Sequence, residues 1–198
     1  MQAVQQLNQI QNFKSTARIF VDAKENYKFV RVLNGVANVT NGLVLIRRQV
    51  NIPDGTYHIG MQGELVPVIH EYGLSYPDVE LVKPPLDKLK PMCEIPKDVV
   101  TALVAFANEV IRLKGTIVLD KGGVFMLQNP AFNVAFPFNY PRQEEVDSKH
   151  FLVAFMEMMQ YSSVYLLQEI RHQTEVPKTP LIIGRDWGHC ALIFTKRS

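Results

Sequence analysis

The chain has little cysteine, no large charge excess and no long apolar run. Its two cysteines, Cys93 and Cys190, lie far apart, which fits neither a zinc knuckle nor a disulfide framework. The 21 Lys and Arg and 19 Asp and Glu leave a net charge of +2, too small to indicate a polyanion partner by itself. No stretch approaches the ~18 apolar residues of a membrane span, and the first residues lack a basic start and an apolar signal segment. We therefore expect a cytoplasmic protein with reduced cysteines and no membrane association.

Catalytic and metal-binding patterns are also missing. His189 next to Cys190 suggests a nucleophile and a base, but adjacent strand residues point to opposite faces and no orienting acid is placed for the imidazole. Glu144, Glu145 and Asp147 offer carboxylates to a cation, yet they precede a helix start, where the helix dipole favours them. The remaining histidines show no ligand spacing: His58, His70, His150 and His172. We expect no enzyme, no metal site and no cofactor.

The first 75 residues predict one short helix followed by strands. Residues 2–13 place apolar side chains at steps of three, which is typical of a helix with one apolar stripe. Asn34-Gly35 is a strong hairpin signal between the strand-like runs 29–33 and 36–40. Asn41-Gly42 is either a second tight turn or a bulge in one long strand, and the sequence leaves both open. Further strands are expected at 17–22, 43–50 and 56–60.

The second half predicts a helix and three strands, twice over. Prolines concentrate in residues 76–91, which we interpret as a linker between residues 1–75 and 92–198. Helices are expected to begin near Pro96 and at Asp147-Ser148. The last two strands are expected to form a hairpin whose loop uses Gly184, Asp186 and Gly188 for its turn conformations. Strands are expected at 116–119, 124–127, 132–138, 164–168, 181–183 and 191–194.

Three stretches carry a resemblance to a known family. Residues 39–45 read Val-Thr-Asn-Gly-Leu-Val-Leu, residues 76–84 read Tyr-Pro-Asp-Val-Glu-Leu-Val-Lys-Pro, and residues 191–197 read Ala-Leu-Ile-Phe-Thr-Lys-Arg. In order and spacing they resemble bacterial sliding clamps, the beta subunit of DNA polymerase III. That family has an Ala-Thr-Asp-Gly-His-Arg-Leu strand, a Phe-Pro-Asp-Tyr linker ending in Pro, and a last strand closing in Met-Pro-Met-Arg. The resemblance covers residues 88–198 well and 1–75 less well.

The resemblance implies an α+β fold of two clamp-like modules, with helices packed on one side of antiparallel sheets. It implies a processivity factor that encircles double-stranded DNA and tethers a DNA polymerase, with a clamp loader as a further partner. Because six modules enclose a duplex, two modules per chain imply a homotrimeric ring rather than a dimer. A clamp with two modules in place of three suggests a phage or a mobile element as its source.

The resemblance also implies two sets of site residues. The DNA-facing set is Gln5, Gln9, Lys14, Arg18, Lys97, Arg112, Lys114 and Lys149. The peptide-binding set is Thr40, Gly42, Leu43, Leu45, Pro84, Phe194, Thr195, Lys196 and Arg197. Leu43 and Val44 replace the family's His and Arg, and Thr195-Lys196 replaces Pro-Met, so the groove is expected to differ in shape. The main alternative is a monomeric clamp-fold protein acting as an adaptor or transcription modulator, and a more distant one is an enzyme using the His189 region.

Overall fold

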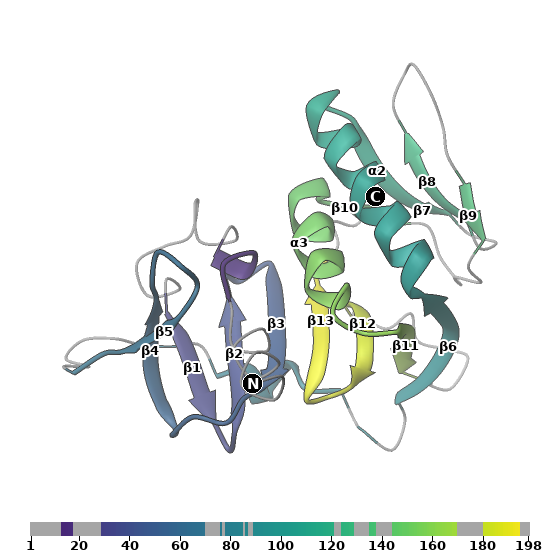
Figure 1. The fold of residues 1–198 in the computed structure, drawn as a ribbon. Coiled ribbons are helices and arrows are strands. Elements are labelled where there is room, and N and C mark those ends of the chain that lie inside the picture. Colours follow the sequence, from purple (N-terminus) through teal and green to yellow (C-terminus); the bar gives the residue numbers. More distant parts are fainter. Residues whose placement is uncertain are drawn as a thin grey trace.

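The computed structural model of the chain describes residues 13–17, 29–69, 76, 78–84, 86, 89–120, 124–128, 135–137, 144–169 and 180–194. All but Phe13 of the helix expected at 2–13, and most of the strand expected at 17–22, lie outside these ranges. Within them the protein is α+β, as expected, with two α-helices and antiparallel sheets (Figure 1).

One antiparallel sheet dominates the described residues. Its nine strands run in the order β5-β4-β1-β2-β3-β13-β12-β11-β6. The five strands from the first half of the chain are β1 (Val30–Leu33), β2 (Val36–Thr40), β3 (Val44–Gln49), β4 (Gly55–Ile59) and β5 (Leu65–Pro67). The four from the second half are β6 (Leu89–Pro96), β11 (Ser163–Glu169), β12 (Leu181–Asp186) and β13 (His189–Ile193). The two halves therefore meet where β3 pairs with β13.

The second half contains two copies of one motif, a strand followed by a helix and three strands. The first copy continues from β6 into α2 (Lys97–Arg112), β7 (Thr116–Asp120), β8 (Val124–Gln128) and β9 (Ala135–Pro137). The second runs through β10 (Glu144–Val146), α3 (Ser148–Met158), β11, β12 and β13. In each copy the first strand pairs with a strand of the other copy: β6 pairs with β11, and β10 pairs with β7. This exchange ties the two copies together, whereas residues 29–69 supply strands only.

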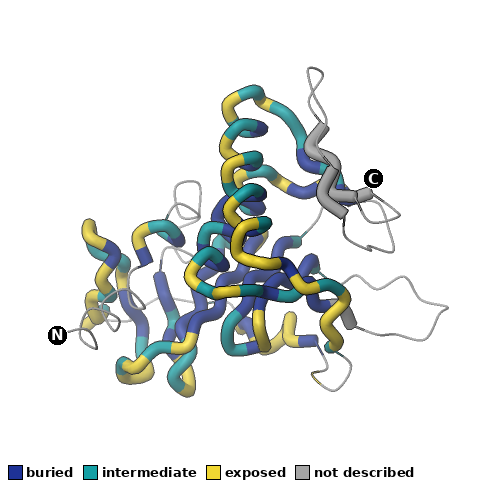
Figure 2. The backbone as a smooth tube through the Cα atoms, turned by 45° about the vertical axis from the view of Figure 1, so that its right-hand side comes forward, coloured by how far each residue is buried: buried dark blue, intermediate teal, exposed yellow. Residues whose placement is uncertain are grey.

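The two helices cover one face of the large sheet, which we call the inner face. They pack against each other, and α3 also packs against β3, β12 and β13 (Figure 1). Figure 2 shows that buried residues concentrate where the sheet passes beneath α3, while one side of α2 stays exposed. The helix α3 therefore lies over the junction between the two halves of the chain.

Local signals explain the turns and helix starts that the sequence predicted. Asn34 and Gly35 have φ of 52° and 70°, which is the left-handed pair that a tight hairpin turn requires. The alternative left open at Asn41-Gly42 is resolved as a turn, because β2 ends at Thr40 and β3 begins at Val44. The carboxylate of Asp147 accepts hydrogen bonds from the backbone N–H groups of Lys149 and His150, both at 3.0 Å, and so caps α3.

Three strands were missed, and one of them falls in the expected linker. Strand β6 begins at Leu89 and contains Pro91 and Pro96, which argued against a strand. Proline is tolerated there because β6 is an edge strand, and no neighbouring strand needs a backbone N–H from its free side. A bulge leaves Met92 without a partner on β11. The others, β5 and β10, have three residues each, too few for a periodic pattern.

Gly184 does not serve the turn for which it was predicted. It lies within β12, opposite Cys190 on β13, and the hairpin turns at residues 187–188 instead. A Cβ atom at Gly184 would stand 2.3 Å from the carbonyl oxygen of His189 and 2.6 Å from the Cα atom of Cys190. The glycine is therefore required by the close approach of two backbones.

Candidate peptide groove and DNA-facing surface

The seam between the two halves of the chain brings together residues that are about 150 positions apart in sequence. Leu45 of β3 faces Leu192 of β13, and Val44 faces Ile193. The backbone N–H of Phe194 donates to the carbonyl oxygen of Leu43 at 2.9 Å, which extends the pairing by one residue. The structure thus places the 43–45 stretch directly beside the end of the last strand.

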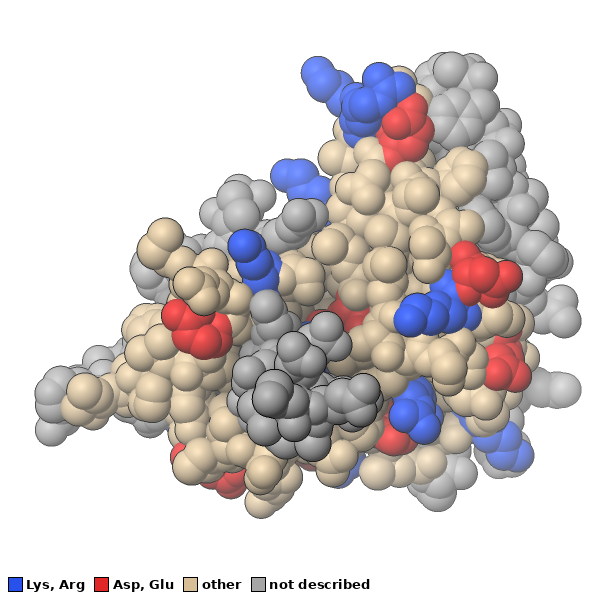
Figure 3. Space-filling view, in the orientation of Figure 1, with Lys and Arg blue, Asp and Glu red and all other residues tan. Residues whose placement is uncertain are grey.

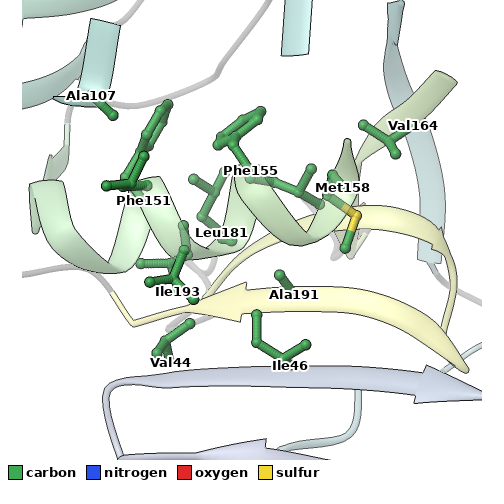
Figure 4. Close-up of a cluster of buried hydrophobic side chains, with 14 of the residues drawn as sticks. Val44, Ile46, Ala107, Phe151, Phe155, Met158, Val164, Leu181, Ala191 and Ile193 are labelled. Atoms are coloured by element: carbon green, nitrogen blue, oxygen red, sulfur yellow. The ribbon is translucent and has the colours of Figure 1, made fainter. Parts of the chain in front are cut away.

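Alternate residues of the seam point to opposite faces of the sheet. Val44 and Ile193 point inward, where Phe151, Phe155 and Met158 of α3 cover them (Figure 4). Leu45 and Leu192 point to the outer face and belong to a second, smaller buried cluster, the outer cluster. Its members are Leu45, Val79, Leu167, Ile182, Trp187, Cys190 and Leu192. The outer face therefore carries an apolar core of its own at the seam.

The turn between β2 and β3 is held rigidly beside the seam. The hydroxyl of Thr40 donates to the carbonyl oxygen of Val44 at 2.6 Å and accepts from the N–H of Gly42 at 3.0 Å. The Oδ1 atom of Asn41 accepts from the N–H groups of Leu43 and Val44 at 2.9 and 3.0 Å. These bonds fix the turn while the Leu43 side chain remains 55% exposed. An exposed leucine on a rigid turn is available to a partner.

The expected peptide-binding residues come together only in part. Thr40, Gly42, Leu43, Leu45 and Phe194 all lie at the seam. Thr40 and Leu45 are buried, and Phe194 is half-buried. Pro84 is also buried, at the end of the segment that covers the outer face. Thr195, Lys196 and Arg197 lie outside the described residues.

The expected DNA-facing residues that are described lie at exposed positions. Lys97 and Arg112 mark the two ends of the exposed side of α2, and Lys149 is exposed in the first turn of α3. Lys114 follows α2 in a left-handed conformation with φ of 54°, and Lys14 is exposed near the start of the described chain. Gln5, Gln9 and Arg18 lie outside the described residues.

The charges on this face do not form a continuous basic band. Arg112 is paired with Glu109 on the same helix, which offsets its positive charge. Figure 3 shows Lys and Arg scattered among Asp and Glu over a largely uncharged surface. Such a surface is more compatible with weak phosphate contacts than with tight binding of nucleic acid.

A buried ion pair across the inner face was missed by the sequence analysis. The Nε and Nη2 atoms of Arg48, on β3, donate to the two carboxylate oxygens of Glu157, on α3, at 2.6 and 2.5 Å. Both side chains are nearly inaccessible, and the Arg48 guanidinium stacks 4.2 Å from the ring centroid of Phe13. Gln160 donates to Glu157 at 2.7 Å. The pair links the first half of the chain to the helix above the seam.

A second missed arginine, Arg47, points to the outer face. Its guanidinium lies 4.2 Å from the ring centroid of Trp187, and its Nη1 atom is 3.2 Å from Oε1 of Glu80. Although desolvation opposes ionisation, hydrogen bonds from Lys83 and Arg47 hold the pKa of the Glu80 carboxyl below its ordinary value. The only sequence signal was Arg47 and Arg48 side by side in an apolar strand, where period-two alternation sends them to opposite faces.

The His189-Cys190 pair differs from expectation in one respect. An acid does stand beside the imidazole, because Nδ1 of His189 is 2.9 Å from Oδ1 of Asp186. The thiol of Cys190 instead points into the outer cluster and donates to the carbonyl oxygen of Trp187 at 3.4 Å. Burial raises the pKa of the Cys190 thiol to about 12, which keeps it protonated and a poor nucleophile.

The described part of the chain lacks two further features. No three His, Cys, Asp or Glu side chains gather there in a way that would hold a metal ion. Neither helix is long and apolar enough to span a bilayer.

No protein-family model matches the chain, and no curated protein matches it in sequence. Solved structures do match. A DNA polymerase sliding clamp from Caulobacter crescentus is 13% identical with a TM-score of 0.59, over 97% of this chain and 64% of that one. The Helicobacter pylori beta clamp bound to a DNA ligase peptide is 11% identical with a TM-score of 0.58, over 96% and 63%.

A third solved structure also matches. The DNA polymerase III beta subunit of Thermotoga maritima is 11% identical with a TM-score of 0.53, over 91% of this chain and 61% of that one. The chain therefore has the fold of bacterial sliding clamps over almost its whole length. It spans less than two thirds of the clamp chains that it matches.

Proposed function

We propose that the chain is a DNA sliding clamp, a polymerase processivity factor encoded by a phage or a mobile element. In this proposal its helical face surrounds duplex DNA and its outer face holds partner proteins through a peptide groove. The observation that carries the proposal is the β3–β13 seam. The seam sets an exposed Leu43 and a half-buried Phe194 side by side over buried Leu45 and Leu192, which are the apolar anchors that a short peptide needs.

The proposed groove makes a direct prediction about partner binding. Deleting residues 194–198 should abolish binding of the replicative polymerase from the same source, because Phe194 forms one wall of the groove. Leu43→Ser should weaken the same binding at least tenfold by removing the exposed apolar wall, and hot-spot losses of this kind reach about 2 kcal/mol or more. Binding is measured by surface plasmon resonance with immobilised polymerase.

A matched variant separates the groove from general surface effects. Leu33 is another leucine at the end of a hairpin strand, 43% exposed, and Leu33→Ser removes a similar side chain away from the seam. It should leave polymerase binding unchanged. If the truncated protein keeps its thermal transition and its affinity, or if both leucine variants weaken binding equally, the groove assignment is wrong.

DNA binding in this proposal is topological. A ring holds a duplex without a strong basic surface, which agrees with a net charge of +2 and with the scattered charges on the helical face. The cations proposed to touch phosphates are Lys14, Arg18, Lys97, Arg112, Lys114 and Lys149, with the amides of Gln5 and Gln9. Their contacts would be independent of sequence.

The edge strands of the sheets bear on whether the chain closes into a ring or stays monomeric. Besides the large sheet, the described residues form a four-stranded sheet in the order β10-β7-β8-β9, so the strands at the four sheet edges are β5, β6, β9 and β10. Three of them contain proline: β5 ends at Pro67, β9 ends at Pro137, and β6 contains two. The fourth, β10, has three residues. Short strands and prolines discourage pairing between chains, which favours a monomeric clamp-fold adaptor or transcription modulator as the second candidate.

Solution mass separates the two candidates. The proposed clamp should associate into a closed trimer at micromolar concentration, seen by light scattering over a concentration series and by native mass spectrometry. A trimer needs a clamp loader or spontaneous opening to admit DNA, whereas an adaptor needs neither. A mass of one chain at every concentration would remove the ring and leave the adaptor.

A further inference from the structure

A short segment of the chain covers the outer cluster at the seam. It consists of Tyr76 and residues 78–84, with the single 3-10 turn η3 (Val79–Val82), and we call it the strap. The hydroxyl of Tyr76 donates to the carbonyl oxygen of Asn38 at 2.7 Å, Val79 is buried in the outer cluster, and Glu80 pairs with Arg47. The strap is thus held to the sheet at three points.

The cover that the strap provides is chemically incomplete. Three polar atoms on this face are buried without a hydrogen-bond partner: Asn38 Oδ1, Arg47 Nε and Trp187 Nε1. Asn38 and Arg47 face each other across β2 and β3, and Arg47 stacks on Trp187, so the three belong to one place. A buried polar atom with no partner costs free energy. The closed strap therefore leaves two donors and one acceptor unsatisfied.

Several side chains of the strap are also exposed to solvent. Leu81 is 83% exposed and Val82 is partly exposed, so both place apolar surface in water. Glu80 reaches Arg47 through the Nη1 atom alone, its other oxygen pairs with Lys83 of the strap at 3.2 Å, and its side chain remains substantially exposed. A carboxylate placed side-on against a guanidinium bonds two nitrogens at once. A different segment could therefore satisfy Arg47 better than the strap does.

We propose that the strap is a displaceable internal ligand, and that the surface beneath it docks an extended acidic segment of a partner protein. The strap itself gives the chemistry of that segment: an aliphatic side chain to replace Val79 in the outer cluster, followed by a carboxylate to replace Glu80. That carboxylate accepts from Nε and a terminal nitrogen of Arg47, and a backbone carbonyl of the segment accepts from Nε1 of Trp187.

This docking surface adjoins the proposed groove, and the two share the buried Leu45 and Leu192 of the outer cluster. The groove uses the Leu43 turn and Phe194, whereas the three unpaired atoms lie on β2, β3 and the β12–β13 turn. The inference requires neither a ring nor DNA. It therefore stands or falls independently of the sliding-clamp proposal.

The test uses a synthetic peptide with the strap sequence, Tyr-Pro-Asp-Val-Glu-Leu-Val, carrying a fluorescent label. Its binding to the full chain is followed by fluorescence anisotropy. Glu80→Gln removes the charge that holds the strap at Arg47 and should raise the affinity for the peptide at least fivefold, since the open state becomes more populated. A peptide with Gln in place of its Glu should bind at least tenfold more weakly to both proteins.

Trp187 is the single tryptophan of the chain, so its fluorescence reports on the strap. Glu80→Gln should make Trp187 more accessible to acrylamide quenching, and the strap peptide should restore its protection. The matched control is Glu109→Gln, which breaks an exposed ion pair on α2 and should change neither quenching nor peptide affinity. Leu43→Ser should also leave peptide affinity unchanged.

Three results would overturn the inference. One is a labelled peptide that binds neither protein at millimolar concentration. Another is equal affinity for the Glu and Gln peptides, which would show that Arg47 does not donate to the peptide carboxylate. The third is loss of peptide binding in Leu43→Ser, which would place the peptide in the groove instead.

Discussion

Replacing Glu157 with Ala is expected to lower the free energy of unfolding by about 3–5 kcal/mol, which is the typical cost of leaving one member of a buried ion pair unpaired. The charge left behind is Arg48, which is buried beneath α3. Because the pair joins β3 to the helix above the seam, the loss should loosen the contact between the two halves of the chain. Urea unfolding followed by circular dichroism measures the change.

A double variant tests whether the cost comes from the orphaned charge. Arg48→Met with Glu157→Leu removes both charges and fills similar volume, and such replacements are often neutral or stabilising. The double variant should therefore recover most of the stability that either single change loses. If the losses in the free energy of unfolding caused by Arg48→Met alone and Glu157→Leu alone sum to the loss of the double variant, the two side chains have no coupling energy across the seam.

Gly184→Ala is the second change expected to have a large effect, a loss of about 3 kcal/mol or more. The new methyl group would stand 2.3 Å from the His189 carbonyl oxygen and 2.6 Å from two atoms of Cys190. Relief requires β12 and β13 to separate, and β13 is the strand that forms the seam with β3. Thermal unfolding measures the loss.

Gly188→Ala is the matched control in the same hairpin. A Cβ atom there meets only the Oδ1 atom of Asp186, at 3.3 Å, and a side-chain atom can shift by the few tenths of an ångström required. The expected loss is below about 1 kcal/mol. Equal losses at the two glycines would mean that the close approach at Gly184 is not what requires glycine.

The sequence predicted the elements whose signals are local. Asn34-Gly35 specifies its hairpin through two left-handed residues, and Asp147 specifies the start of α3 through its own side chain. These signals act over two to four residues and need no tertiary partner. The α+β class followed from the order of such elements, and the likeness to sliding clamps followed from that order together with the stretches 39–45, 76–84 and 191–197. The structural matches confirm the fold.

The remaining features depend on contacts that no local pattern records. Strand β6 is a strand because β11 pairs with it, although its own prolines argue for a linker. The Arg48–Glu157 pair joins residues 109 positions apart, and each residue alone reads as an ordinary surface charge. The clamp resemblance expected Leu43 and Leu45 to meet residues 194–197, and of these Phe194 is described and pairs with Leu43. The resemblance gave no indication of Arg47, Trp187 or the unpaired atoms beneath the strap.

If the protein encircles DNA as proposed, its release from circular DNA should differ from its release from linear DNA. The protein is loaded on nicked circles, with its loader if one is needed, the salt is raised, and a restriction enzyme then linearises half of the sample. Charge reversal at Lys14, Arg18, Arg112 and Lys114 serves as a comparison, because it should weaken binding to open linear DNA while retention on circles largely persists.

We expect the protein to stay on the salt-washed circles and, after linearisation, to leave within the time needed to slide off the new ends. A topological link is insensitive to salt but is lost as soon as an end appears. Release at the same rate from circle and line would contradict the sliding-clamp account and would make the monomeric adaptor the better description of this protein.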